Sequence, residues 1–176
     1  MKRNVVLTLM PVFGMVVIFA SVIAATPGHG YISIPAPAFR PQAYTYQYSI
    51  TSLWVRNLDG NSDYFYAPLE LPNGATITKL TFYWSDSSTS ADGYCTLSRG
   101  NLQGSYGLGM AAAYTSGDTG DAASSEDISI ELATVDNSQY GYILTVYLPD
   151  SGVEAYGVIV EYTFQTSLPL IKRNSQ

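Results

Sequence analysis

Hydrophobic and polar side chains alternate with a period of two residues through much of the chain after residue 43. The clearest run is Ala75–Trp84, and similar runs cover residues 44–51, 64–71, 142–148 and 158–164. Turn signals such as Asp59-Gly60 and Pro72-Asn73-Gly74 separate them. This alternation is typical of antiparallel strands with one buried and one solvated face.

The spacing of strands and turns predicts an all-β protein, an antiparallel β-sandwich of jelly-roll-like form. We find no helical pattern outside a signal helix in residues 1–25. We expect a proline-rich extended arm over 26–43, a sandwich domain over 44–166 and a flexible tail over 167–176. Within the domain, residues 116–125 indicate a soft acidic loop. Ile128, Ile130 and Leu132 indicate a strand after it.

The N-terminal segment has the pattern of an export signal. Lys2 and Arg3 form a basic head, an apolar run follows, and small residues at Val22 and Ala24 suit cleavage after Ala24, with Ala25 as the second choice. If the segment is not cleaved, residues 5–25 are long enough to anchor the chain in a membrane. Either alternative predicts a secreted or extracellular domain.

Charge and motif content exclude several function classes. The net charge is −6, and removal of the export segment with its two cations would make it −8. Such a chain is repelled by nucleic acid. No glycine-rich phosphate-binding pattern lies at a strand-to-helix junction, so a nucleotide partner is not expected.

Catalytic residues are scarce. His29 is the only histidine and lies on the predicted arm, which leaves no evident partner for a nucleophile. Cys95 is the only cysteine and follows a strand pattern, so it is either a small buried residue or a thiol for intermolecular pairing. Glycoside hydrolysis needs two carboxylates across a cleft, which sequence cannot reveal. We therefore expect no enzyme and no cofactor beyond weak structural calcium.

Two acidic segments are candidate calcium sites. Asp59, Asn61 and Asp63 follow the D-x-N-x-D pattern of an EF-hand loop, with Glu70 at its twelfth position. Tyr64 replaces the glycine of the sixth position, and strand patterns replace the helices, so a polar hairpin turn is the alternative. The second candidate holds four acids, with a solvated loop as its alternative: Asp118, Asp121, Glu126 and Asp127.

Tyrosine is unusually abundant, with 15 copies. Its apolar ring and polar tip suit a core, an interface or a ligand platform. Tyr44, Tyr46 and Tyr48 alternate with polar residues, so we predict that they line one strand face and form the ligand-binding surface. The alternative is that most of the rings fill the core and its rim.

Three passages carry a family resemblance: Tyr31–Pro35, Ala67–Thr78 and Tyr156–Tyr162. Together they resemble secreted bacterial β-sandwich domains of unassigned function, which tend to end on a similar Tyr-Gly-Val…Glu-Tyr strand. The resemblance covers most of residues 31–164. It implies an exported β-sandwich and carries no catalytic residue.

These observations favour an exported, non-catalytic binding module that recognises carbohydrate or another cell-surface polymer. The alternative is a structural or adhesive surface protein that self-associates through open sheet edges, as a homo-oligomer. A small hydrolase is the third and weakest hypothesis.

Overall fold

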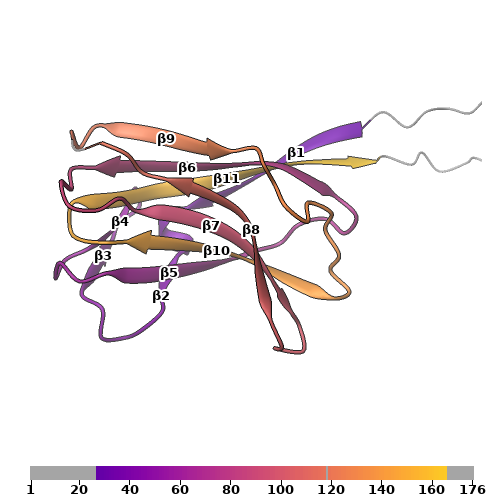
Figure 1. Ribbon diagram of the computed structural model, residues 1–176, viewed down its shortest axis with the longest axis horizontal. Coiled ribbons are helices and arrows are strands. Elements are labelled where there is room, and N and C mark those ends of the chain that lie inside the picture. The colour runs from indigo at the N-terminus through magenta and orange to yellow at the C-terminus, as the bar shows by residue number, and fades with distance from the viewer. Residues whose placement is uncertain (1–26, 118, 166–176) are drawn as a thin grey trace, which may run out of the picture.

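The computed structural model describes residues 27–117 and 119–165. They form two antiparallel sheets that lie one above the other (Figure 1). The first sheet has the order β3 (Tyr48–Ile50), β4 (Val55–Asn57), β11 (Val153–Gln165), β6 (Thr76–Asp86) and β9 (Ala122–Asp127), with β1 (Pro27–Pro35) also paired to β11. The second has the order β2 (Arg40–Pro41), β5 (Asp63–Leu69), β10 (Tyr140–Leu148), β7 (Tyr94–Asn101) and β8 (Gly107–Tyr114). The expected jelly-roll-like β-sandwich is confirmed.

The core lies between the sheets and is built by the alternation seen in the sequence. On β10, residues 142, 144, 146 and 148 are buried, whereas the residues between them face outward. Phe65 on β5 and Phe82 on β6 are fully buried, one from each sheet. Burial of such side chains supplies the main stabilising free energy of a fold of this kind.

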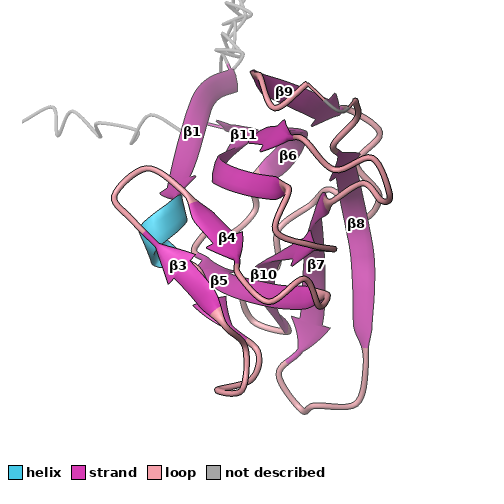
Figure 2. Cartoon of the chain, turned by 90° about the vertical axis from the view of Figure 1, so that its left-hand side faces the viewer, coloured by secondary structure: helices cyan, strands magenta, loops and turns pink. Residues whose placement is uncertain are grey.

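The extended arm predicted over 26–43 is a regular strand of the first sheet over residues 27–35, a longer pairing than a brief one around Tyr31–Ile34. Residues 27–35 form β1, which pairs with β11 from Pro27 opposite Gln165 to Pro35 opposite Gly157. Gly28 and Gly30 permit this pairing, because a β-carbon at either position would collide with the ring of Phe164 or Tyr162 on β11. After β1, the short 3₁₀ helix η1 (Ala36–Ala38) carries the chain towards β2 in the other sheet (Figure 2).

Two further strand predictions need correction. The strand expected over 44–51 begins only at Tyr48, and Tyr44 lies in a turn. The strand expected at Ile128, Ile130 and Leu132 lies one segment earlier, as β9, which overlaps the end of the loop predicted over residues 116–125. β9 is serine-rich and gains its stability from partners on β6: the indole nitrogen of Trp84 donates to the hydroxyl of Ser125 at 3.1 Å.

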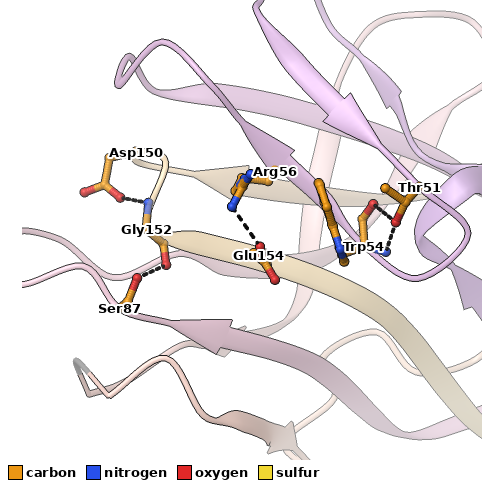
Figure 3. A network of polar contacts seen from close by, with 7 residues as sticks. All are labelled: Thr51, Trp54, Arg56, Ser87, Asp150, Gly152 and Glu154. Atoms are coloured by element: carbon orange, nitrogen blue, oxygen red, sulfur yellow. Dashed lines mark hydrogen bonds and ion pairs between the residues drawn. The ribbon is translucent and has the colours of Figure 1, made fainter.

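Four loops gather at one end of the sandwich, on the left of Figure 1: 58–62, 87–93, the described residues 115–117 and 119–121 between β8 and β9, and 149–152. The β10–β11 turn is fixed there by hydrogen bonds (Figure 3). The hydroxyl of Ser87 donates to the carbonyl of Gly152 at 3.0 Å, and the amide of Gly152 donates to Asp150 at 2.7 Å. An ion pair of 3.2 Å between Arg56 and Glu154 joins β4 to β11. This end is therefore held in a defined shape.

The export segment and the tail over 167–176 lie outside the described residues. Within residues 27–117 and 119–165, no helix is both long and apolar enough to cross a membrane.

Candidate functional site

A row of four tyrosines crosses the outer face of the second sheet. Tyr147 on β10 lies opposite Tyr64 on β5 and opposite Tyr94 on β7, and Tyr94 lies opposite Tyr114 on β8. The four residues, called the tyrosine row below, thus occupy one level of four neighbouring strands. At a strand spacing of about 4.8 Å, the row is about 14 Å long.

The rings of the tyrosine row contact one another in sequence. The centroids of Tyr94 and Tyr147 are 4.8 Å apart with an interplanar angle of 22°, which is a stacked pair. Tyr64 and Tyr147 are 4.9 Å apart, and Tyr94 and Tyr114 are 5.7 Å apart, both tilted. The three inner rings, of Tyr64, Tyr147 and Tyr94, are partly buried in these contacts. Tyr114 ends the row on the edge strand β8 and is 58% exposed, so it offers a ring face.

The hydroxyl group of Tyr94 is held in its protonated form. Burial, the hydrogen bond with Tyr64 and the neighbouring phenols raise the pKa of Tyr94 to about 12. A phenol with this pKa remains a hydrogen-bond donor and acceptor throughout the physiological pH range. The hydroxyl of Tyr94 can therefore bind neutral polar ligands without a change of charge.

The surface beside the row carries further hydroxyl groups. Thr145 on β10 lies opposite Tyr66 on β5 and Thr96 on β7, one level along the same outer face. At the other side, loop 87–93 leads into Tyr94 and lines a polar hollow of about 450 Å³ with Gly117. Rings, hydroxyls and a polar hollow thus adjoin one another on this part of the molecule.

The predicted platform of Tyr44, Tyr46 and Tyr48 is not a flat row on one strand. Tyr44 is fully exposed in its turn, whereas Tyr46 and Tyr48 contact the buried ring of Phe65, with centroids 6.4 Å and 5.5 Å away. Two of the three rings thus pack against the core. Their predicted role in ligand binding stays a prediction.

The first acidic segment lies in the β4–β5 turn. The carboxylate of Asp59 accepts a hydrogen bond from the amide of Asn61 at 3.1 Å. Asp63 begins β5 and is fully buried, and neither of its side-chain oxygens has a hydrogen-bond partner. Glu70 is exposed beyond the other end of β5, so an EF-hand arrangement is excluded.

The second acidic segment is not assembled. Asp118 lies outside the described residues, and Asp121 precedes β9, whereas Glu126 and Asp127 end that strand. Glu126 pairs with Lys79 at 3.1 Å, and Asp127 accepts the amide of Ala112 at 2.8 Å. Among the residues that the structure describes, no group of three or more His, Cys, Asp or Glu side chains is placed to hold a metal ion.

The remaining sequence candidates are accounted for by their positions. Cys95 is fully buried on β7, and burial raises the pKa of its thiol, which fits the prediction of a core residue. His29 is exposed on β1.

A separate shallow apolar hollow of about 300 Å³ lies on the first sheet, where Tyr83 and Tyr156 are among its lining residues.

Asp63 predicts a pH dependence of stability. Burial and, to a smaller extent, the charge of Asp59 raise its pKa from 3.8 to about 6. Because the folded chain then binds this proton more tightly than the unfolded chain, the free energy of unfolding falls as pH rises from about 4 to about 6 and is level above.

We expect Asp63→Asn to remove this effect. With a chelator present, we compare the free energy of unfolding of the variant with that of the wild type. The variant's value minus the wild-type value should be about 1 kcal/mol greater at pH 7 than at pH 5, because folded wild-type Asp63 loses its proton between these pH values. Urea unfolding at the two pH values measures it. A difference that is the same at both pH values would contradict the placement of this carboxylate.

Comparisons with known proteins find likeness in fold only. Scans against protein-family models and against curated protein sequences find no match. The C-terminal family 6 carbohydrate-binding module of a laminarinase from Zobellia galactanivorans aligns with a TM-score of 0.46 at 13% identity, over 74% of this chain and 98% of that one. The xylan-binding domain CBM22-2 of Xyn10C from Paenibacillus barcinonensis aligns with a TM-score of 0.47 at 8% identity. This match covers 78% of this chain and 99% of that domain.

A two-module xylanase fragment from Clostridium thermocellum, containing a family 22 carbohydrate-binding module, aligns with a TM-score of 0.49 at 10% sequence identity. This match covers 83% of the present chain and 29% of the xylanase fragment. All three TM-scores are below 0.5, so these matches carry no information about the function of this protein.

Proposed function

We propose that the protein is an exported, non-catalytic binding module and that the tyrosine row binds a carbohydrate polymer. The observation that carries the proposal is the placement of four tyrosines at one level of four adjacent strands. Such an arrangement gives an extended, linear surface on a rigid sheet, which suits an extended chain.

The chemistry of the row matches that of a sugar. Phenol hydroxyls both donate and accept hydrogen bonds, as sugar hydroxyls do, and Thr145 and Thr96 add two more such groups. The exposed ring of Tyr114 can stack on the apolar face of a sugar, since aromatic rings present a polarisable flat surface. The rings are already ordered by their mutual contacts, so little conformational entropy is lost on binding.

A role in proton-transfer catalysis is not supported at this surface. General acid–base groups work best with a pKa near the operating pH. The pKa of Tyr94 is raised to about 12, far from neutrality. The row is therefore suited to recognition.

Self-association through a sheet edge is the less favoured function. On the edge strand β8, the carbonyl of Met110 already accepts the amide of Glu131 at 2.8 Å. The amide of Ala112 donates to Asp127 at 2.8 Å. These contacts cover part of the edge that another chain would need for strand pairing.

Gel electrophoresis in the presence of soluble polysaccharides tests the proposal. We expect at least one neutral polysaccharide to retard the full chain. Tyr147→Ala should weaken that retardation about 5- to 30-fold. The substitution removes an inner ring and leaves Tyr64 and Tyr94 without their shared neighbour, a loss of about 1 to 2 kcal/mol of binding free energy. Tyr147→Phe, which keeps the ring, separates the contribution of the hydroxyl.

Tyr83→Ala is the matched control, since Tyr83 lies on the first sheet in the apolar hollow. It should leave the retardation unchanged. Retardation that survives Tyr147→Ala but is lost in Tyr83→Ala would place the binding surface on the other sheet and reject the proposal.

A further inference from the structure

Asp63 is the least satisfied polar side chain at the loop-bearing end of the sandwich. It is fully buried, and both carboxylate oxygens lack a hydrogen-bond partner. An isolated buried carboxylate is costly, because it has lost its hydration without gaining a compensating contact. A buried, unpartnered carboxylate of this kind is a candidate ligand for a cation.

Two asparagines lie close to the start of β5, where Asp63 stands. Asp63 lies opposite Leu148 in the sheet, and the side-chain amide of Asn57 donates to the carbonyl of Leu148 at 3.4 Å. The same amide donates to the carbonyl of Asn61, and Asn57 is itself fully buried. Asn57, Asn61 and Asp63 are thus brought to one place at the start of β5.

Asp59 supplies a second negative charge from the turn. Asp59 is exposed in the β4–β5 turn, and its carboxylate accepts the amide of Asn61 at 3.1 Å, so it lies in the segment that leads directly into Asp63. Two carboxylates that repel each other in the absence of a cation become favourable ligands in its presence.

We infer that the β4–β5 turn binds a calcium ion, with Asp59 and Asp63 as its charged ligands and amide or carbonyl oxygens of Asn57 and Asn61 as neutral ones. Calcium accepts six to eight oxygen ligands in flexible geometry, whereas magnesium demands a near-ideal octahedron. The donor set contains neither histidine nor cysteine, so it does not suit zinc. Weak sites of this type fill in an extracellular medium.

The site would also fix one end of the tyrosine row. Tyr64 follows Asp63 directly, and Tyr147 precedes Leu148. A bound ion would therefore join the β4–β5 turn to the two strands that carry these rings. The calcium inference nevertheless stands on the buried carboxylate alone and does not depend on the proposed function.

Thermal unfolding of the full chain after chelation tests the inference. At calcium of about 100 times the dissociation constant, we expect the melting temperature to rise by about 5 to 10 °C. Magnesium or sodium at the same concentration should give a much smaller rise. Terbium, a luminescent substitute for calcium, should show emission excited through the tyrosines and displaced by calcium.

Three variants locate the site. Asp59→Asn, an exposed substitution in the turn, and Asp63→Asn should each abolish the calcium-dependent rise and weaken terbium binding at least 10-fold. Glu70→Gln is the matched control: an EF-hand would lose its twelfth ligand, whereas the present site should bind calcium as before. No response of the wild type to calcium, an equal response to magnesium, or an unchanged response in Asp59→Asn would overturn the inference.

Discussion

Replacing Phe65 by alanine is expected to lower the free energy of unfolding by about 3 to 5 kcal/mol. The ring is fully buried on β5, and its removal leaves a cavity that the sheets cannot close. The same ring holds Tyr46 and Tyr48 at 6.4 Å and 5.5 Å between centroids, so the loss extends to the segment before β4. Chemical denaturation measures the effect.

A double-mutant cycle shows whether Tyr48 belongs to this packing. Phe65→Ala and Tyr48→Ala should be coupled by about 0.5 to 1.5 kcal/mol, since each removes the other's edge-to-face partner. Tyr44→Ala, at a fully exposed position, should change stability by less than about 0.5 kcal/mol. Additive effects of Phe65 and Tyr48 would show that Tyr48 is free to act elsewhere.

Asp86→Ala is expected to cost about 3 kcal/mol, the second large effect. Asp86 ends β6 in a buried position and accepts hydrogen bonds from the hydroxyl of Thr115 and, at 2.9 Å, from the amide of Ser88. Thr115 in turn accepts the amide of Gly93 at 2.7 Å. Loss of the carboxylate would leave buried donors unpaired in both loops that flank the tyrosine row.

The matched control for Asp86 is Asp92→Asn, an exposed acid in the same loop. It should leave the unfolding free energy within about 0.5 kcal/mol of wild type. Asp86→Asn keeps one acceptor oxygen, so its free energy of unfolding should lie between those of Asp86→Ala and Asp92→Asn. Equal stability of Asp86→Ala and Asp92→Asn in a urea titration would show that the buried network does not hold this end together.

The two-sheet fold was predictable because alternation reports directly which face of a strand is buried. Residues 142–148 of β10 follow the pattern, whereas β6 departs from it, because residues 80–82 and 84–86 are buried at consecutive positions. β1 was missed because prolines and glycines usually disfavour strands, whereas here Gly28 and Gly30 make room for rings on β11. β9 was missed because its stability comes from side chains on β6, which no local pattern in a serine-rich segment reveals.

The candidate site was only partly predictable. The sequence predicts a row of tyrosines at Tyr44, Tyr46 and Tyr48. Local alternation can place such a row only along a single strand. The observed row runs across four strands, and its members are at least 20 positions apart in the chain. Only the strand register brings them together. The one available signal was that each tyrosine stands at or next to a strand end, beside the same set of loops.

In the β4–β5 turn, the candidate residues were predictable from the sequence. The D-x-N-x-D spacing alone indicates Asp59, Asn61 and Asp63 as candidate calcium ligands. The burial of Asp63 and its lack of partners became visible only in the fold, because they depend on β10 passing opposite it. Glu70, which the spacing also suggested, is carried away by the extended strand β5.

The binding surface can be tested most directly by two-dimensional NMR. Oligosaccharides from the polysaccharide that retards the protein are added to the isotope-labelled full chain, and shift changes are mapped onto its residues. We expect the changes to centre on Tyr64, Tyr94, Tyr114 and Tyr147, with Thr145 and Thr96 beside them. Changes centred on Tyr44, or on the hollow at Tyr83 and Tyr156, with the tyrosine row unaffected, would contradict the proposed binding surface.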